Sequence, residues 1–227
     1  ARGIRRYDNT RLLALGVLGT AMLTMSWLGL ILMTSILNPL KQVISIFREI
    51  SNGRYDSTIT VEGRDEISKV MLALRTMQSR LGVNEEAIHQ LAFYDPLTKL
   101  PNRRLLRDRL QQALSTSARN RLYGAVLMID LDNFKSVNDS RGHAVGDHLL
   151  QEVGLRIQSC VRQADTVARL GGDEFIVMLV DLNVDETHAT LEAAGVGEKI
   201  LAAIGQPCML AQQIHHPSAS MGLCLFL

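Results

Sequence analysis

Cysteine is scarce in this chain and follows no metal-binding or disulfide pattern. The 227 residues include three cysteines, Cys160, Cys208 and Cys224, and no two of them have C-x-x-C spacing. This odd, widely spaced set gives no basis for a disulfide framework or for a zinc site. We therefore expect reduced thiols, mostly in the core, in a cytosolic compartment.

The chain also lacks a large net charge and the composition of a disordered or repetitive polymer. Hydrophobic residues make up 47% and charged residues 21%, which excludes wholesale disorder and a collagen-like repeat. The formal net charge of +1 divides into +3 over residues 1–37, +2 over 38–82 and −4 over 83–227. The acidic C-terminal portion argues against a nucleic-acid groove, which needs clustered Lys and Arg, so no nucleic-acid partner is expected.

A long stretch without any charge lies near the N-terminus, between Arg11 and Lys41. Its 26 residues Leu12–Leu37 span about 39 Å as a helix, against a hydrocarbon core of about 30 Å. A signal peptide fits poorly because its apolar region has only about 7–15 residues, and a buried core helix is the other alternative. We expect a transmembrane helix over 12–37, ended by Pro39. Basic residues flank both sides, so the positive-inside rule leaves the orientation open.

Two short amphipathic patterns follow, and each has apolar residues at heptad spacing. Such seams are too short to be stable alone. The seams consist of Leu40, Val43, Phe47 and Ile50, and of Ile67, Val70, Leu74, Met77 and Leu81. Gly53 breaks the first helix, and Ile59 and Val61 alternate with polar residues in an extended connector. A generic coiled-coil linker would show the same pattern.

Short motifs in this region nevertheless indicate a particular kind of domain. Asn38-Pro39-Leu40, Gly53 and Gly63-Arg64-Asp65-Glu66-Ile67 resemble a HAMP domain over residues 38–82. The resemblance implies a parallel four-helix bundle in a homodimer, on the cytoplasmic side of a bacterial inner membrane. Residues 1–11 would then end an extracytoplasmic segment, and residues 83–94 would form a linker helix.

The remaining residues alternate between helical and strand-like patterns. Helical spacing covers Leu105–Leu114, Leu149–Val161 and Thr190–Ile204. Strand-like runs cover Leu122–Ile129, Thr166–Leu170, Phe175–Val180 and Ser218–Phe226. The order β-α-β-β-α-β predicts an α/β (α+β) domain with a ferredoxin-like sheet, a fold that by itself fixes no function.

Acidic residues end the central strand and occupy a Gly-Gly hairpin. Strand alternation puts Asp130 and Asp132 on one face with Leu131 opposite, and the hairpin presents Asp173 and Glu174. If the hairpin lies beside the strand, up to four carboxylates converge and repel one another unless a hard cation such as Mg²⁺ is present. This pattern indicates metal-assisted phosphoryl chemistry. Either element alone would be an ordinary strand end or a polar hairpin.

Six further motifs occur in order between about Leu91 and Leu227. They are Asp95-Pro96-Leu97-Thr98-Lys99-Leu100-Pro101-Asn102-Arg103, Asp130-Leu131-Asp132-Asn133-Phe134-Lys135, Asn138-Asp139, Gly142-His143, Gly146-Asp147 and Gly171-Gly172-Asp173-Glu174-Phe175. Together they resemble the GGDEF family of diguanylate cyclases. The resemblance implies a nucleotidyl-cyclase-like domain over 95–227 that joins two GTP into cyclic di-GMP and pyrophosphate, using Mg²⁺ or Mn²⁺, where two domains face each other.

The same resemblance implies a catalytic role for several of these residues. Asp130 and Asp173 would hold the metal, helped by the backbone carbonyl of Leu131. Asp173 or Glu174 would assist deprotonation of the ribose 3′-hydroxyl, and Lys135 would offset charge that grows on the phosphate.

Substrate contacts follow from the resemblance as well. Asn138 and Asp147 would hydrogen-bond the guanine, and the amides near Asn133 and Phe134 would hold the terminal phosphates. His143 fits a structural or substrate-edge role better than metal ligation, because the other candidate ligands are hard oxygens.

A regulatory site is implied by Arg162 and Asp165, whose R-x-x-D spacing before the hairpin matches the family's inhibitory site for cyclic di-GMP. The alternative is an i,i+3 surface ion pair at a helix end, which contributes little. His215-His216 lacks partners at ligand spacing and is expected on a strand or loop.

Two departures from the family pattern stand out. Lys99 occupies a position where the family usually has Gly, and the chain stops at Leu227, before an expected helix and last strand. We therefore expect a fragment with a C-terminally truncated cyclase domain, from a protein whose sensor precedes residue 1, and the sequence leaves open whether the fragment is active by itself. The alternatives are a catalytically silent nucleotide-binding module controlling a downstream EAL phosphodiesterase, and a chemoreceptor-type signalling protein.

Overall fold

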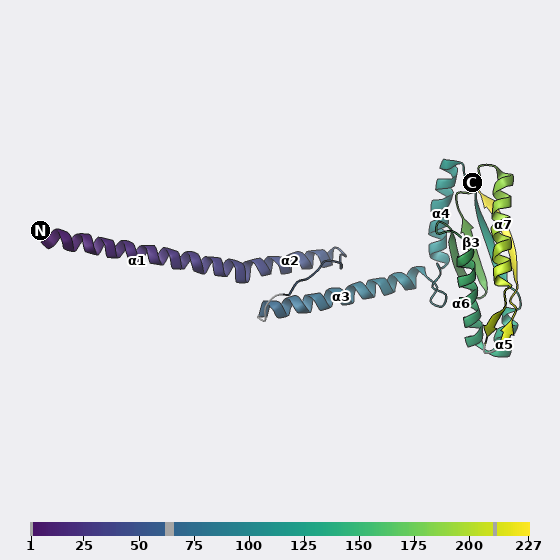
Figure 1. Cartoon of the computed structure of the whole chain (residues 1–227), viewed down its shortest axis with the longest axis horizontal. Coiled ribbons are helices and arrows are strands. Elements are labelled where there is room, and N and C mark those ends of the chain that lie inside the picture. Colours follow the sequence, from purple (N-terminus) through teal and green to yellow (C-terminus); the bar gives the residue numbers. More distant parts are fainter. Residues whose placement is uncertain (1, 62–65, 211–212) are drawn as a thin grey trace. The chain divides into compact units, whose positions relative to one another are not determined.

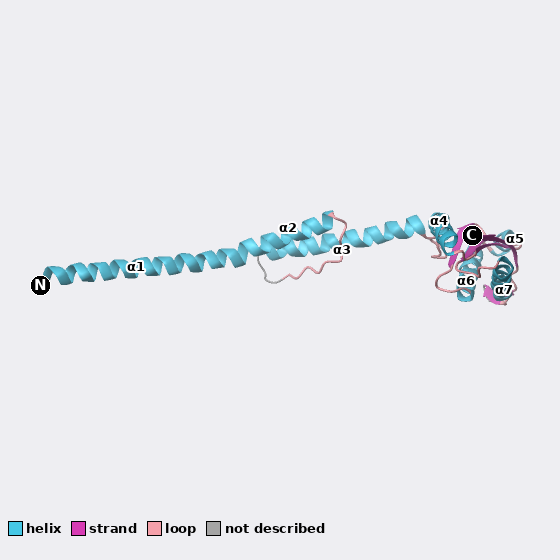
Figure 2. Ribbon diagram, turned by 90° about the horizontal axis from the view of Figure 1, so that it is seen from above, coloured by secondary structure: helices cyan, strands magenta, loops and turns pink. Residues whose placement is uncertain are grey.

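The computed structural model describes residues 2–61, 66–210 and 213–227, and the chain divides into two units, Ala1–Glu86 and Ala87–Leu227. Among the described residues, strands occur only in the second unit, as Figure 2 shows. The first unit contains α1 (Arg2–Leu32), the π-helical turn η1 (Met33–Leu37), α2 (Asn38–Ser51) and the start of α3 (Glu66–Phe93).

Pro39 does not end the apolar helix, contrary to the expectation from sequence. The helix continues through η1 into α2, and the Asn38 N–H donates to the carbonyl of Met33, five residues back. A proline inside a regular helix removes a donor and its ring clashes with the carbonyl four residues earlier. The wider π-turn directly before Pro39 relieves that clash, so the chain bends without breaking.

The pairing of α2 with α3 buries part of the heptad seams expected from sequence, namely Val43, Ile50 and Leu74. Val43, Ile46 and Ile50 are buried on α2, whereas Leu40 and Phe47 are 52% and 49% exposed. On α3, Leu74 is buried as expected, but Met71 takes the place of the expected seam residues Val70 and Met77. A single pair of helices buries one stripe on each, so the other apolar positions of the predicted seams stay exposed within one chain.

The connector between α2 and α3 is extended, as expected. Gly53 has a φ of +72° and ends the helix, and Ile59 is buried against the helix pair. Gln78 on α3 is buried and donates from Nε2 to the carbonyl and hydroxyl oxygens of Ser57, at 3.0 and 2.8 Å. The motif residues 63–65 lie outside the described residues.

The second unit begins with the end of α3 and continues with alternating helices and strands. Its remaining elements are α4 (Arg103–Asn120), β1 (Gly124–Leu131), α5 (Phe134–Arg141), α6 (His143–Cys160), β2 (Thr166–Gly171), β3 (Glu174–Leu179), α7 (Glu186–Ile204), β4 (Cys208–Leu210), β5 (Gln213–His215) and β6 (Ala219–Phe226). The main sheet has the order β2-β3-β1-β6 with every pair antiparallel, and β4 and β5 form a separate hairpin. This order confirms the predicted ferredoxin-like α/β fold.

Alternation along β1 separates two apolar clusters. Ala125, Leu127 and Ile129 are fully buried against residues of α6 and α7. On the other face Val126 lies in the cluster that α4 covers through Leu106 and Leu110. Figure 1 accordingly shows the strands between α4 and α7. Because β1 is central and flanked by β3 and β6, it is a rigid support for the acids at its C-terminal end.

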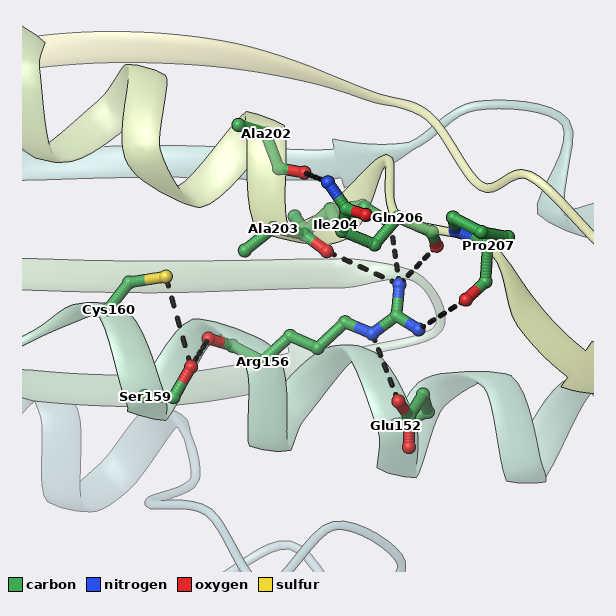
Figure 3. A network of polar contacts seen from close by, with 9 residues as sticks. All are labelled: Glu152, Arg156, Ser159, Cys160, Ala202, Ala203, Ile204, Gln206 and Pro207. Carbon is green, nitrogen blue, oxygen red and sulfur yellow. Dashed lines mark hydrogen bonds and ion pairs between the residues drawn. The ribbon is translucent and has the colours of Figure 1, made fainter.

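Arg156 joins the end of α7 to α6 (Figure 3). Its guanidinium donates to Glu152 on its own helix and to the carbonyls of Ala203, Ile204, Gln206 and Pro207. The last carbonyls of a helix have no partner within the helix, so an arginine from a neighbouring element can satisfy several at once. This contact fixes where the chain leaves α7.

The predicted elements are present, with shifted ends. The first strand begins two residues later than expected, at Gly124, because Tyr123 instead exchanges backbone hydrogen bonds with Leu182 and Asn183. Helix α5 and the β4–β5 hairpin were not predicted. His215 ends β5, in agreement with the expected strand or loop, and residues 211–212 lie outside the described residues.

Candidate active site

The acids of the central strand lie where alternation predicted them. Asp130 is exposed, Leu131 is buried and Asp132 is exposed. Asp130 pairs with Glu174 on β3 and with Ser220 on β6, so its carboxylate is flanked by both neighbouring strands. The β2–β3 hairpin therefore lies beside the end of β1, as the sequence argument required.

Three other acids lie close enough to Asp130 to affect its pKa. Desolvation raises the pKa of Asp130, and repulsion by Asp173, Glu174 and Asp132 raises it further. Repulsion of this kind between carboxylates favours a bound cation. The cluster sits at the sheet end from which α5 departs.

The acids do not form an all-protein metal cage. Across residues 2–61, 66–210 and 213–227, no three His, Cys, Asp or Glu side chains are arranged to hold a metal ion. Asp132 is turned toward β6, where the hydroxyls of Ser218 and Ser220 donate to its two carboxylate oxygens at 2.8 and 2.9 Å. The remaining oxygen donors fit Mg²⁺, which commonly uses one or two carboxylates and completes its shell with water and substrate phosphates.

The hairpin turn depends on its two glycines. Gly171 and Gly172 have φ values of +140° and +53°, in a region that L side chains rarely adopt. A register shift between Arg169 and Gly171 accompanies the turn. The following Asp173 accepts a backbone hydrogen bond from Leu131 at 3.4 Å, which ties the turn to the end of β1.

Arg169 is a site residue that the sequence argument missed. It donates from Nη1 to both carboxylate oxygens of Asp95 at 3.0 and 3.1 Å. Its Nε and Nη2 atoms donate to the carbonyl of Gly172 at 3.1 and 2.7 Å. The guanidinium thus connects the segment after α3 to the turn that presents Asp173 and Glu174. The spacing of 74 residues between Asp95 and Arg169 left no local signal.

Asp95 and Lys99 shape the segment that Arg169 reaches. Asp95 also accepts from the backbone N–H and hydroxyl of Thr98, at 2.8 and 2.7 Å. Burial alone would raise the pKa of Asp95, but the hydrogen bonds from Thr98 and Arg169 and the charge of Arg169 hold it below its ordinary value. Lys99 adopts a φ of +60°, so the turn is preserved although a lysine stands at a position suited to glycine.

The proposed phosphate-binding residues lie on and around α5. Asn133 precedes the helix with a φ of +58°, Phe134 is buried, and Lys135 is exposed. Asn133, Lys135, Ser136, Asp139 and Ser140 line an open hollow beside the helix. An anion there would meet the backbone N–H groups of Phe134 and Lys135, because that of Ser136 already donates to the Asn133 carbonyl at 2.9 Å.

The two proposed guanine contacts are brought together by a glycine. A Cβ atom at Gly146 would lie 2.0 Å from Oδ1 of Asn138, so a larger residue there would have to displace the Asn138 side chain. Asp147 follows directly and is exposed, and His143 is exposed at the first residue of α6. The fold therefore places Asn138 beside the helix turn that carries Asp147.

The Arg162–Asp165 pair differs from the surface ion pair considered as its alternative. Asp165 accepts from the backbone N–H of Arg162 at 2.9 Å and from that of Val180 at 3.3 Å. Both residues line a cavity together with Glu192 and Lys199 of α7. The Arg162 side chain is exposed there, so the loop presents a guanidinium and a backbone-held carboxylate.

The apolar helix of the first unit qualifies as a membrane span by length and composition only. It is the one such candidate among the described residues. It runs from Leu15 to Ser51, and the mean hydropathy of its 18-residue window is 1.8. Its apolar side chains are exposed, for example Met25 and Trp27.

Comparison with known proteins matches both parts of the chain. Residues 92–227 match the family model "Diguanylate cyclase, GGDEF domain", and residues 31–82 match the HAMP domain. The chain is 48% identical over 143 residues to the bifunctional diguanylate cyclase/cyclic di-GMP phosphodiesterase MucR of Pseudomonas aeruginosa, covering 63% of this chain. It is 32% identical over 204 residues to the diguanylate cyclase TpbB of P. aeruginosa, covering 86% of this chain.

A solved structure supports the same assignment. The GGDEF domain of TpbB superposes with a TM-score of 0.55 at 39% identity, covering 59% of this chain and 75% of that one. The chain spans only 20% of the length of MucR and 46% of that of TpbB. Since the GGDEF model covers more than half of the chain, the chain belongs to the GGDEF-domain family of diguanylate cyclases and carries a HAMP domain before that domain.

Proposed function

We propose that this protein is a membrane-anchored diguanylate cyclase that condenses two GTP into cyclic di-GMP. The convergence of Asp130, Asp173 and Glu174 beside α5 carries the proposal. In each step the ribose 3′-oxygen of one GTP, after losing its proton, attacks the α-phosphorus of the other. The bond to the β-phosphate breaks and pyrophosphate leaves. Two such steps close the ring.

The acids would hold a divalent cation, Mg²⁺ or Mn²⁺. Asp130, Asp173 and the Leu131 carbonyl supply hard oxygens at one sheet end, which supports this assignment. The cation, when bound, offsets phosphate charge and favours ionisation of the attacking hydroxyl. Asp173 or Glu174 would accept the hydroxyl proton. Lys135, exposed on α5, would stabilise charge that develops on the phosphate.

Substrate selection would rest on Asn138 and Asp147. A carboxylate accepts from the ring and exocyclic N–H groups of guanine, and adenine would leave these groups unpaired. The amides near Asn133 and Phe134 would bind the terminal phosphates, and His143 would lie at the substrate edge. The close approach of Asn138 to Gly146 supports a preformed base site.

The HAMP domain would regulate the cyclase as a homodimer. Leu40 and Phe47 on α2, with Val70 and Met77 on α3, leave a second apolar stripe exposed within one chain. A second copy would cover this stripe and complete a four-helix bundle. Each catalytic domain holds one GTP, so the geometry of the bundle would set how the two half-sites face each other.

We further propose that the apolar helix anchors the protein in a bacterial inner membrane. With a single span in this chain, the HAMP and cyclase domains would lie in the cytoplasm, where GTP is available. The length and exposure of the helix and the adjacent HAMP match support this arrangement.

Feedback inhibition by cyclic di-GMP would act at Arg162 and Asp165. A guanidinium can stack on or hydrogen-bond guanine, and a carboxylate accepts its N–H groups. The cavity that these residues share with Lys199 supports a ligand of this kind. Titration with cyclic di-GMP should therefore lower the initial rate in the wild type but not in Arg162→Ala.

The proposal is tested by incubating the intact protein with Mg²⁺ and either GTP or ATP. Product should form from GTP and not from ATP, and Asp173→Ala should abolish it. Glu198→Ala replaces an exposed acid on α7, away from the acidic cluster, and serves as the matched control. Normal turnover by Asp173→Ala would refute the roles given to Asp173.

A second candidate is a regulatory GGDEF module that controls a downstream EAL phosphodiesterase. The likeness to MucR, whose name includes both activities, favours keeping this alternative. The same incubation distinguishes the two, because a silent module would bind GTP without forming the cyclic dinucleotide.

A further inference from the structure

The carboxylate of Asp132 accepts two hydrogen bonds from serines at the start of β6. Its Oδ2 atom accepts from the hydroxyl of Ser218 at 2.8 Å, and its Oδ1 atom accepts from that of Ser220 at 2.9 Å. The backbone N–H of Asp132 donates to the carbonyl of Ser218 at 3.0 Å. We call this group of three residues the hydroxyl clasp. It binds the residue just after β1 to the start of β6 through three hydrogen bonds.

The clasp also determines the direction of a neighbouring carbonyl. A trans peptide group is planar, so its C=O points away from its N–H. The N–H of Asp132 points to β6, and the carbonyl of Leu131 in the same peptide group must therefore point away from β6. The N–H of Leu131 donates toward Asp173 on the other side, at 3.4 Å. The Leu131 carbonyl thus faces the hairpin acids.

We propose that Asp132 is a positioning residue that aims the Leu131 carbonyl at the metal through the hydroxyl clasp. This inference rests on the proposed function, in which that carbonyl, Asp130 and Asp173 hold the metal. The Asp132 carboxylate is turned to the β6 side, where each of its oxygens accepts one hydroxyl hydrogen bond, and we assign it no direct contact with the metal. Changing a residue that orients a metal ligand typically lowers metal affinity by about 10–100-fold.

The two roles open to Asp132 give opposite results when the serines are changed. If Asp132 is a positioning residue, removing the serine hydroxyls frees the peptide group between Leu131 and Asp132 to reorient, and metal affinity falls. A ligand that the serines hold away from the metal would instead be released, and affinity would stay the same or rise. The double variant Ser218→Ala/Ser220→Ala therefore distinguishes the roles without altering any charge.

The test measures Mn²⁺ binding to the intact protein in detergent by electron paramagnetic resonance, without nucleotide. We expect the double alanine variant to bind Mn²⁺ about 10-fold more weakly. Asp132→Asn retains one acceptor oxygen and should also bind more weakly. The double variant Ser218→Thr/Ser220→Thr keeps both hydroxyls and should recover most of the affinity. Ser115→Ala, an exposed serine of α4 bonded to its own helix, should bind normally.

Each outcome bears on a different claim. Normal or tighter Mn²⁺ binding by the double alanine variant, with its helical circular dichroism unchanged, overturns the positioning role while leaving the proposed function intact. No Mn²⁺ binding by the wild type overturns the proposed function and this inference with it. In activity assays, the alanine variant should need more Mg²⁺ for half-maximal rate and recover its maximal rate at saturating Mg²⁺.

Discussion

Replacing Arg169 with methionine is expected to loosen the turn that carries the catalytic acids. The guanidinium makes two contacts with the carboxylate of Asp95 and two with the carbonyl of Gly172. Methionine fills a similar volume but donates no hydrogen bond. Asp95 therefore loses its cation, and the peptide group directly before Asp173 loses both of its donors.

The size of the effect follows from burial. Only 10% of the Arg169 side chain and 15% of the Asp95 side chain are exposed. Exposed ion pairs contribute about 0–1 kcal/mol, whereas removing one partner of a buried pair costs about 3–5 kcal/mol. Thr98 continues to donate twice to Asp95, which offsets part of the loss. We expect the unfolding free energy of the second unit to fall by about 2–3 kcal/mol.

Hydrogen exchange of the intact protein in urea, read by mass spectrometry, measures this change. Peptides that cover 171–175 should exchange faster in Arg169→Met, and Arg169→Lys, which keeps the charge but not the fork of donors, should be intermediate. Arg119→Met, at an exposed position of α4, is the control. A double-mutant cycle with Asp95→Asn that yields no coupling energy would refute the account of this contact.

The contact between Arg169 and Asp95 also makes the stability of the folded protein depend on pH. The pKa of Asp95 is lower in the folded protein than its ordinary value of 3.8. Its contribution to stability is therefore present above that ordinary value and is lost as the pH falls through the folded-state pKa. In Arg169→Met the acid-induced loss should be smaller, as measured by urea unfolding at a series of pH values.

Three other predictions follow from the structure. Gly146→Ala should displace Asn138 and raise KM for GTP about 10-fold or more in steady-state assays, with little change in melting temperature. An unchanged KM would contradict the close approach of Asn138 to Gly146. Burial and neighbouring acids raise the pKa of Asp130, so Mn²⁺ binding should weaken on acidification at a higher pH than it would at an isolated aspartate. Electron paramagnetic resonance titrations with Mn²⁺ at several pH values measure this, and a loss of binding only near the ordinary aspartate pKa would contradict it. Arg156→Met should lower the unfolding free energy by about 2–3 kcal/mol in urea, and a change below about 0.5 kcal/mol would contradict the role of the contacts in Figure 3.

Much of the cyclase fold could be predicted because its signals are local. The apolar run that forms β1 identifies a central strand, and alternation alone placed Asp130 and Asp132 on one face. The acids of the hairpin adjoin two glycines whose positive φ values require that residue type. Each inference needed only neighbouring residues and the strand period of two.

The parts that escaped prediction depend on distant partners or short elements. Helix α5 has eight residues and β4 and β5 have three each, too few for a clear period. Asp132 was assigned to the acidic cluster, but its hydroxyl partners lie 86 and 88 residues away. Nothing in the local sequence distinguishes a carboxylate that faces the cluster from one that turns to β6.

In the two helices before the cyclase domain, the predicted seams contain buried residues, such as Val43 and Leu74, and residues that are exposed within one chain. Ile46 and Phe47 are adjacent apolar residues, and only the packing of α2 against α3 shows that Ile46 is the one buried within a single chain. Pro39 likewise suggested a helix end, because sequence rules assume a regular helix and not the π-turn that precedes this proline. The expectation of a helix end at Pro39 was wrong because local helix geometry overrode a sequence rule.

The central claim, that the converging acids catalyse GTP condensation, is tested most directly by one product analysis. The intact protein is incubated with GTP and Mg²⁺, and the nucleotides are separated and identified by mass spectrometry. We predict cyclic di-GMP with two pyrophosphates per product molecule, and none from Asp130→Asn or Asp173→Ala. Wild-type protein that binds GTP and Mg²⁺ but forms no cyclic dinucleotide would contradict the claim.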